Sequence, residues 1–203
     1  MVAGGYTVRL LRGEELWEIE EELARLRIEV FEEYPYLYKG TMAYEMDYLK
    51  MYLESRRSVC VAVFEEGSFE LVGASTALPL EEAEEEFQRP FEEAGEDVGG
   101  LFYFGESVLR APWRGKGLGK RFFEEREAHA LSVLGGGLEG TTFCAVRRPD
   151  DHPLKPGGYQ DLSGFWRSRG YERRPDLVAH YTWQDIGKKE ETSKEMVFWW
   201  KQH

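Results

Sequence analysis

The hydrophobic positions of this chain follow two different periods. Apolar residues recur every three or four positions from 16 to 30, which predicts an amphipathic helix that continues to about Glu33 and ends before Pro35. The same spacing between 42 and 53 predicts a second helix. Unbroken apolar runs instead predict strands, and they lie at 6–11, 58–64, 71–78 and 101–104.

The second half of the chain continues this succession of helices and strands. Strands are predicted at 141–146, 178–184 and 196–201, and a short helix at 163–169 that ends at Gly170. The acidic segment 81–86 is predicted to be an exposed helix or loop. Residues 147–162 are rich in proline and glycine and predict a long loop, of the kind that often carries function. We find no repeat and no linker, so we predict one α/β domain over residues 1–203.

Composition and charge narrow the functional classes. The formal net charge of −12 argues against a general nucleic-acid binder and leaves room for a cationic or amine substrate. Cys60 and Cys144 both lie in strand-like apolar runs, so we expect no disulfide and a reducing compartment. The sequence shows neither a cationic and apolar leader nor an apolar run of membrane-spanning length. We therefore predict a cytoplasmic protein without membrane contact.

A basic, glycine-rich turn follows the strand at 101–104 and precedes a helix. Its residues are Arg114, Gly115, Lys116, Gly117, Leu118, Gly119, Lys120 and Arg121. A strand, a glycine-rich turn and a helix together present free backbone N–H groups to an anion, and glycine lets a ligand approach the main chain closely. Lys120 and Arg121 fall in the first helical turn, where the helix dipole disfavours cations. A bound polyanion would attract these cationic side chains and so offset their repulsion by the helix dipole. The alternative interpretation is a basic turn that binds no ligand and is exposed to solvent.

Two common phosphate-binding loops do not fit this turn. A Walker A motif requires glycine where Arg114 stands, and serine or threonine where Arg121 stands. A dinucleotide-binding fingerprint accepts the first two glycines but requires a third at Lys120. The turn instead resembles the acyl-CoA-binding motif of the GNAT superfamily of N-acetyltransferases. That motif is Gln/Arg-x-x-Gly-x-Gly/Ala, and it is matched at Arg114, Gly117 and Gly119.

A second landmark supports the resemblance. Family members often carry an aromatic pair followed by Gly-aromatic in a short helix after the fifth strand, and this chain has Phe165-Trp166 and Gly170-Tyr171. The predicted order of elements is also similar to the GNAT fold along nearly the whole chain. The resemblance implies a mixed central sheet flanked by helices on both faces. It further implies transfer of acetyl from acetyl-CoA directly to an amine through a ternary complex, the acceptor being a small molecule or a peptide amine.

The resemblance also implies where acetyl-CoA binds. In the family the main chain of the motif grips the CoA pyrophosphate, which assigns residues 114–121 to this role. The strand before the motif diverges from its neighbour, and its backbone binds the pantetheine arm and the thioester. The matching positions in this chain are Val108, Leu109 and Arg110.

Trp166 departs from the family pattern. Many members have a tyrosine there, near the thiol, whereas an indole N–H is no acid near neutral pH. At this position Trp166 is expected to form a wall of the CoA channel. The departing CoA thiolate would then take its proton from another group or from water. Three tyrosines are available for this role, although packing explains each of them better: Tyr159, Tyr171 and Tyr181. The absent tyrosine motivates an alternative function, a non-catalytic acyl-CoA-binding sensor.

Glu106 is the candidate general base, directly or through a water. It interrupts an apolar strand close to where the thioester should lie, and burial makes a carboxylate a stronger base. The alternatives are a glutamate paired with a nearby arginine, or one that points to solvent at a strand end. Regular alternation places Glu106 on the same face of its strand as Phe104 and Val108.

Aromatic residues suggest further roles. Tyr34 and Tyr36 fall between the first two helices, where the GNAT fold borders the acceptor, so they line that pocket or pack against the core. Trp199 and Trp200 mark the core or a contact between two copies, which leaves a homodimer open.

The polar segment 150–152 carries residue types that bind metals but lacks a second ligand at the required spacing, so we predict no metal site.

Overall fold

Seven strands form one mixed sheet in the computed structural model, which describes residues 5–203. The strand order is β1-β2-β3-β4-β5-β7-β6, and only β4 and β5 run parallel to each other. The strands are β1 (Tyr6–Leu11), β2 (Val59–Glu65), β3 (Leu71–Pro79), β4 (Leu101–Leu109), β5 (Gly140–Val146), β6 (Glu172–Gln184) and β7 (Glu191–Gln202). The sheet confirms the predicted α/β fold class with its mixed central sheet.

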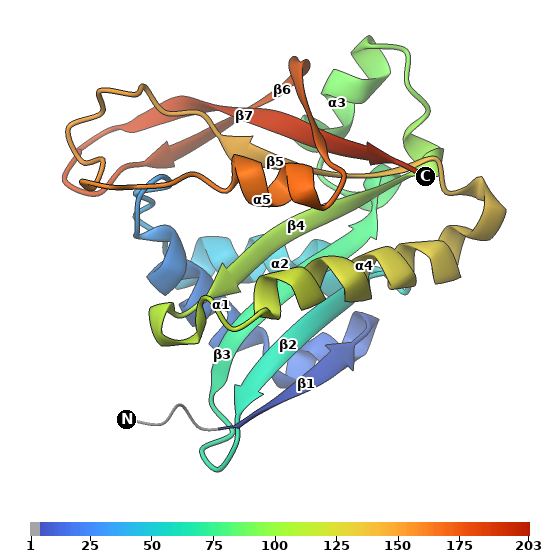
Figure 1. Cartoon of the computed structure of the whole chain (residues 1–203), viewed down its shortest axis with the longest axis horizontal. Coiled ribbons are helices and arrows are strands. Elements are labelled where there is room, and N and C mark those ends of the chain that lie inside the picture. The colour runs from blue at the N-terminus through green and yellow to red at the C-terminus, as the bar shows by residue number, and fades with distance from the viewer. Residues whose placement is uncertain (1–4) are drawn as a thin grey trace.

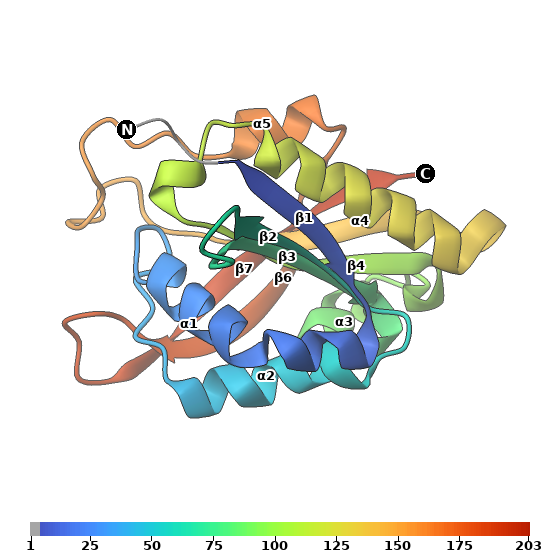
Figure 2. The same ribbon diagram turned by 90° about the horizontal axis from the view of Figure 1, so that it is seen from below.

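Helices cover both faces of this sheet. The α-helices are α1 (Glu20–Phe31), α2 (Met42–Glu54), α3 (Glu85–Glu93), α4 (Leu118–Leu134) and α5 (Ser163–Ser168). Short 3-10 helices are η1 (Gly13–Glu18), η2 (Leu80–Glu82), η3 (Val98–Gly100), η4 (Ala111–Trp113) and η5 (Gly135–Gly137). Figure 2 shows α1, α2 and α3 on one face and α4 and α5 on the other. Figure 1 shows α4 running across the front of β2, β3 and β4.

The strands were readable from the sequence because the central ones are buried on both faces. Every residue of β3 is buried, as are the first six of β2. A strand that is covered on both faces appears as a continuous apolar run. The last strand shows the same effect, because Phe198 and Trp199 are both buried in the core. Of the two roles proposed for this segment, the structure supports the core.

The first predicted helix is interrupted. The segment begins as η1, changes direction at Ile19 and continues as α1, which ends at Phe31 rather than at about Glu33. The second predicted helix agrees with α2, whose first turn is capped by Thr41 Oγ1 accepting from the Tyr44 N–H at 3.3 Å.

The acidic segment contributes to the core as well as to the surface. It forms η2 and the start of α3. Glu81, Glu85 and Glu86 are exposed as predicted, whereas Glu82 and Glu84 are half-buried. Phe87 on the opposite side of α3 is buried, and its ring stacks on Tyr103 at 4.6 Å and on Tyr181 at 5.0 Å. The charge run is therefore one side of an amphipathic helix that covers β4 and β6.

A β-bulge interrupts β4 and corrects the predicted facing of Glu106. Ser75 of β3 pairs with Ser107 and Ala77 pairs with Phe104, so two residues of β4 oppose one residue of β3. Phe104 packs in the cluster on the α4 face, whereas Val108 packs in the cluster beneath α1 and α2. Regular alternation would have placed both on one face. Because of the bulge, Glu106 lies on the face of Val108 and not on that of Phe104.

Two residues hold this bulge. Gly105 has no room for a side chain, because a Cβ atom there would overlap the hydroxyl of the buried Tyr52. Arg126 of α4 is fully buried and donates from Nη1 to the Thr76 carbonyl at 3.3 Å and from Nε to the Phe122 carbonyl at 3.1 Å. Burial lowers the pKa of Arg126 to about 10. The bulge is therefore braced from both faces of the sheet.

Within residues 5–203, none of the helices combines the length and the apolar character needed to cross a bilayer.

Candidate functional site

The central feature of the site is the divergence of β4 and β5. They pair only over Leu101–Tyr103 and Gly140–Thr142, although β4 continues to Leu109 and β5 to Val146. Beyond this point β4 keeps β3 as its only partner, and β5 keeps β7. In Figure 1 the two strands separate toward the side where the loop after β5 lies. Each strand therefore turns an unpaired edge of peptide groups toward the other. This is the divergence that the resemblance implied.

The helix α4 begins beside the divergence and has no side-chain cap. Gly115 and Gly117 have φ values of 75° and 82°, which lie in the left-handed region that favours glycine. The first backbone bond of the helix runs from the Arg121 N–H to the Gly117 carbonyl at 3.1 Å. The N–H groups of the first helical residues, from Leu118 to Lys120, have no partner within the helix. Such N–H groups are free to bond to an anion, which is the role that the sequence predicts for this turn.

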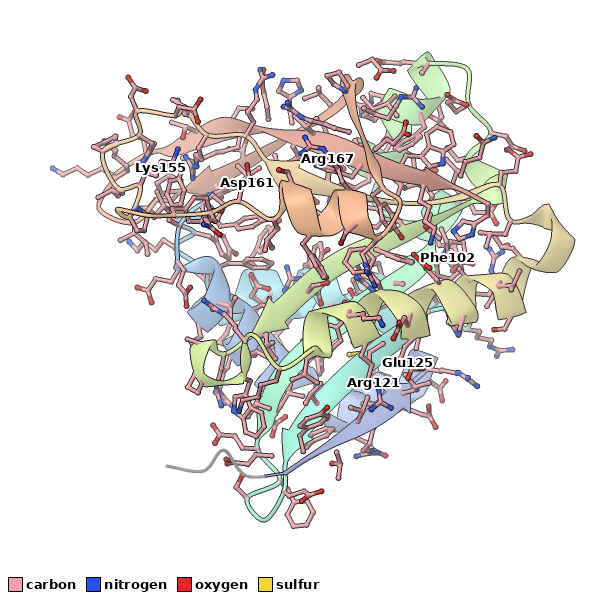
Figure 3. All side chains as sticks on the ribbon, viewed as in Figure 1. Phe102, Arg121, Glu125, Lys155, Asp161 and Arg167 are labelled. Atoms are coloured by element: carbon pink, nitrogen blue, oxygen red, sulfur yellow. The ribbon has the colours of Figure 1, made fainter. Side chains whose placement is uncertain are left out.

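The basic side chains of this turn are paired with carboxylates. Arg114 makes a two-pronged bond to Glu33 at 2.7 and 2.9 Å, and Lys120 pairs with Glu124 at 3.3 Å. Figure 3 shows Arg121 and Glu125 on neighbouring turns of α4, and their atoms approach to 3.3 Å. The expected repulsion in the first turn is therefore already offset. A phosphate would share or replace these exposed pairs.

Lys116 differs from its basic neighbours. Its Nζ lies 4.2 Å from the centre of the Trp113 ring and has no hydrogen-bond partner among residues 5–203. A buried ammonium that lacks an acceptor is available to an anionic ligand.

The direction of the peptide groups separates the residues predicted to bind the thioester. The Arg110 N–H donates to the Val72 carbonyl at 3.0 Å, so the peptide groups of Arg110 and, by alternation, of Val108 face β3. Those of Leu109 and Ser107 face the free edge. The Leu109 carbonyl already accepts from Arg114 Nε at 2.9 Å. Sequence reasoning missed Ser107, because the bulge that orients it is a tertiary feature.

Glu106 belongs to a buried ion cluster. Its Oε2 accepts from Arg27 Nη1 of α1 at 2.5 Å, and Arg27 Nε donates to Glu45 of α2. Glu106 and Glu45 are buried, and Arg27 also lies 4.0 Å from the centre of the Tyr48 ring. Burial alone would lower the pKa of Arg27, but Glu106 and Glu45 outweigh it and raise this pKa well above its ordinary value. The alternative of a glutamate paired with an arginine is therefore present in the structure.

Arg27 and Glu45 were not identified from the sequence, although a signal for them exists. Arg27 follows Leu23 by four positions on the apolar side of α1, and Glu45 follows Met42 by three on that of α2. A charged residue inside an apolar stripe indicates a buried partner of opposite charge.

Tyr34 and Tyr36 have different surroundings. Tyr34 packs edge-on against Tyr159 of the long loop at 4.7 Å, so the loop is brought against the connection between α1 and α2. Tyr36 lies 4.6 Å from Phe31, and its carbonyl accepts from Arg148 Nη2 at 2.6 Å. Burial raises the pKa of Tyr36. Both tyrosines lie at the predicted connection, Tyr36 as part of the packing and Tyr34 beneath the loop.

The short helix α5 meets the glycine-rich turn through Phe165. A Cβ atom at Gly119 would lie 3.6 Å from Phe165 Cζ, which is ordinary contact. Trp166 packs instead on Trp199 at 5.0 Å and on Phe143 of β5 at 5.1 Å. Of the aromatic pair, Phe165 is therefore the residue that lies against the turn, whereas Trp166 supports the β5 side.

The three tyrosines considered as acids lie apart from one another. The buried Tyr171 hydroxyl is bonded to Thr141 Oγ1 at 2.7 Å and donates to Glu127 at 3.1 Å. Tyr181 stacks on Phe87 on the opposite face, and Tyr159 packs on Tyr34 in the loop. Of the three, Tyr171 lies beside Trp166, because its N–H donates to the Trp166 carbonyl at 3.1 Å and both rings pack on Phe143. Its hydroxyl, however, is taken by Thr141 and Glu127.

Glu84 extends the acidic character of the α1 and α2 face. It precedes α3, is half-buried, and lies within electrostatic range of Arg27 and Asp47. Burial, followed by repulsion from Glu86, raises the pKa of Glu84 to about 7. The charged form of Glu84 is therefore disfavoured in the protein as it stands.

Glu84 should give the free energy of unfolding a distinct pH dependence. Its pKa is higher in the folded chain, so the stability it contributes at low pH is lost as the pH rises from about 4.5 to about 7. Glu84→Gln cannot ionise. We expect it to match the wild type near about pH 4 and to be more stable by about 1 kcal/mol near about pH 8, a value reduced for solvent screening.

Urea denaturation at both pH values measures this difference. The matched control is Glu92→Gln, which makes the same charge change at an exposed position of α3. A stability difference for Glu84→Gln that does not grow with pH would contradict the assigned environment.

The chain has the fold of solved GNAT-type acetyltransferases. Arabidopsis thaliana NAA60 in complex with a bisubstrate analogue matches with a TM-score of 0.59 at 11% identity, over 98% of this chain and 99% of that one. An acetyltransferase of the GNAT family from Streptococcus pneumoniae matches with a TM-score of 0.56 at 12% identity, over 98% and 100%. Aminoglycoside acetyltransferase AAC(6')-Ib with coenzyme A and kanamycin matches with a TM-score of 0.55 at 15% identity, over 98% and 95%. The sequence matches no protein-family model and no curated protein. At these identities the likeness establishes the fold, which is the fold that the two sequence motifs implied.

Proposed function

We propose that this protein is an acetyl-CoA-dependent N-acetyltransferase of the GNAT type. The carrying observation is the divergence of β4 and β5 beside the uncapped start of α4. Free N–H groups for a pyrophosphate and a free strand edge for a pantetheine arm then lie next to each other. The similarity to an enzyme solved with coenzyme A and to another solved with a bisubstrate analogue supports this proposal.

The chain offers groups for each requirement of direct acetyl transfer. The amine must lose a proton, the thioester carbonyl needs a hydrogen-bond donor, and both substrates must be held together. Main-chain groups of Ser107 and Leu109 face the free edge, where they would contact the thioester. Glu106 is the proposed acceptor of the amine proton, directly or through a water. Arg27 would position its carboxylate.

The departing thiolate requires no side-chain acid in this proposal. Tyr171 is engaged in the core, and Trp166 supplies no acidic proton. Water can protonate a CoA thiolate, so we propose that it does.

A non-catalytic acyl-CoA-binding sensor is the second candidate. The observation that favours it is the ion pair between Glu106 and Arg27, which occupies the proposed base. Release of CoA thiol from acetyl-CoA separates the two functions when it is measured with a panel of small amines and peptide amines. Mass spectrometry identifies the acetylated product. An enzyme releases thiol in proportion to product, whereas a sensor binds acetyl-CoA and releases none with any amine.

Gly117→Val is expected to weaken acetyl-CoA binding by at least about 10-fold. Its branched side chain would stand in front of the free N–H groups of α4, which would otherwise bond to the pyrophosphate. Calorimetric titration measures the loss. Gly67→Val is the matched control, because Gly67 also has a positive φ, 94°, and open space around an added Cβ atom. Equal affinity of both variants would remove the turn from the cofactor site.

Two further proposals concern the setting of the protein. We propose a reducing, cytoplasmic compartment, which is supported by the free thiols of Cys60 and Cys144. A homodimer remains a proposal, for which β6 offers an outer sheet edge. Among residues 5–203 this edge pairs with the chain only at its end, where the Gln184 carbonyl accepts from the Lys39 N–H at 2.9 Å. Light scattering on the purified protein tests it.

A further inference from the structure

We propose that Glu33 is a built-in competitor of acetyl-CoA. In the protein without a ligand, Glu33 holds the Arg114 side chain against the free edge of β4. Acetyl-CoA must take Arg114 away from Glu33 before its pyrophosphate and its pantetheine arm can both bind. The inference rests on the proposed function, because it concerns the affinity of the same cofactor site.

Arg114 connects the end of α1 to the free edge of β4. Its Nη1 and Nη2 donate to the two carboxylate oxygens of Glu33 at 2.7 and 2.9 Å, and its Nε donates to the Leu109 carbonyl at 2.9 Å. The peptide groups of Leu109 face the free edge, where the pantetheine arm is proposed to bind. One guanidinium therefore occupies an acceptor of the proposed groove, and it pairs with a carboxylate where a phosphate is proposed to lie.

The position of Glu33 favours this pair in the protein without a ligand. Glu33 lies two residues beyond the end of α1, and the last turn of that helix contains no basic residue. The C-terminal end of a helix carries a partial negative charge that disfavours carboxylates. A carboxylate at this position gains from a nearby cation, and Arg114 supplies it.

The neighbouring pair shows which part of the structure stays fixed. Arg110 stands four residues before Arg114; it donates from Nε to Glu29 at 2.9 Å and from Nη1 to Glu70. Its main-chain N–H is bonded to β3 at 3.0 Å. Figure 2 shows the segment between β4 and α4 beside the end of α1. The Arg114 side chain can therefore leave Glu33 while Arg110 keeps this segment in place.

An exchange of partners by Arg114 links the two parts of the cofactor site. A phosphate accepts a two-pronged bond from a guanidinium as a carboxylate does, so the pyrophosphate can replace Glu33. When Arg114 turns toward the pyrophosphate at the start of α4, the Leu109 carbonyl becomes free for an N–H of the pantetheine arm. The cost of releasing Glu33 lowers the affinity for acetyl-CoA, and removal of the Glu33 charge should raise it.

Calorimetric titration with acetyl-CoA tests the inference. We expect Glu33→Gln to bind acetyl-CoA about 3- to 5-fold more tightly than the wild type, because an exposed ion pair contributes a free energy of this size. Glu29→Gln is the matched control and should bind acetyl-CoA with nearly the wild-type affinity. The side chains of Glu33 and Glu29 are 50% and 52% exposed, and each pairs with an arginine. Arg110, however, keeps Glu70 and does not bond to the free edge.

Two results of this titration would overturn the inference. An equal gain in Glu33→Gln and Glu29→Gln would show only the general effect of one negative charge less. Weaker binding by Glu33→Gln would show that Glu33 positions Arg114 for the phosphate instead of competing with it.

A double-mutant cycle with Arg114→Met assigns the effect to one side chain. In the Arg114→Met background, the added change Glu33→Gln should leave the affinity for acetyl-CoA unchanged, because no guanidinium remains for Glu33 to hold. A gain that persists in this background would contradict the proposed exchange of partners.

Affinity and turnover separate this inference from the proposed function. The expected cycle without thiol release from any amine would sustain Glu33 as a competitor and overturn the proposed enzyme. Thiol release, combined with equal acetyl-CoA affinity of the wild type, Glu33→Gln and Glu29→Gln, would sustain the enzyme and overturn the competitor.

Discussion

Glu106→Gln is expected to lower kcat by about 10²–10⁴-fold while the affinity for acetyl-CoA stays near that of the wild type, which is the usual contribution of one general base. Glutamine keeps the size of the side chain and can still bond to Arg27, but it cannot accept the amine proton. The loss should shrink at high pH, where more of the acceptor is already the free amine. Steady-state kinetics with a saturating amine measure kcat, and calorimetry measures the affinity for acetyl-CoA.

Glu45→Gln is the matched control for this prediction. Glu45 and Glu106 each accept one bond from Arg27 and are both buried, so both variants remove the same kind of ion pair. Only Glu106 stands on β4 next to the free edge. Glu45→Gln should therefore leave kcat near the wild-type value. An unchanged kcat for Glu106→Gln near neutral pH would leave Glu106 with a structural role as the partner of Arg27.

Arg27→Met is expected to reduce the free energy of unfolding by about 3–5 kcal/mol, the usual result of removing one partner from a buried ion pair. Methionine fills most of the space of the arginine stem, so the loss comes mainly from leaving Glu45 and Glu106 buried without a counter-charge. The destabilisation should diminish at acid pH, because buried carboxylates without a cation take up protons. Urea denaturation near neutral pH and in acid measures both effects.

Arg25→Met provides the comparison on the same helix. Arg25 pairs with Glu21 at 2.9 Å, but both side chains are more than half exposed, at 61% and 64%. Removal of an exposed pair of this kind costs less than about 1 kcal/mol. The combined variant Arg27→Met, Glu45→Gln, Glu106→Gln should recover much of the lost stability, since it removes the uncompensated charges. Similar losses for Arg27→Met and Arg25→Met would show that water reaches the cluster.

These variants also separate two roles of the cluster. Arg27 joins α1, α2 and the bulge of β4 through side chains alone. If the proposed function holds, one guanidinium both stabilises the fold and orients the base. The Glu106 variant tests the second role and the Arg27 variant tests the first.

The local elements were determined by the sequence itself. The buried strands β2 and β3 appear as unbroken apolar runs, and α2 appears in the three-to-four spacing of its apolar residues. The start of α4 was visible in Gly115, Gly117 and Gly119, because a left-handed turn and a close approach to the main chain both demand glycine. These features depend on residues that are neighbours in the chain, so composition and spacing suffice to predict them.

The arrangement of the site was decided only by the tertiary structure. Arg27 and Glu106 are 79 residues apart, and Arg114 and Glu33 are 81 apart, so no local pattern could show that they meet. The bulge in β4 reversed the facing that regular alternation predicted for Glu106, since it arises from the pairing with β3 and from the contact with Tyr52. The unpaired edge of β4 likewise exists because β5 leaves it after three residue pairs. Motifs that act through the local backbone could be read from the sequence, whereas the buried charges and the orientation of the base depend on packing between distant segments.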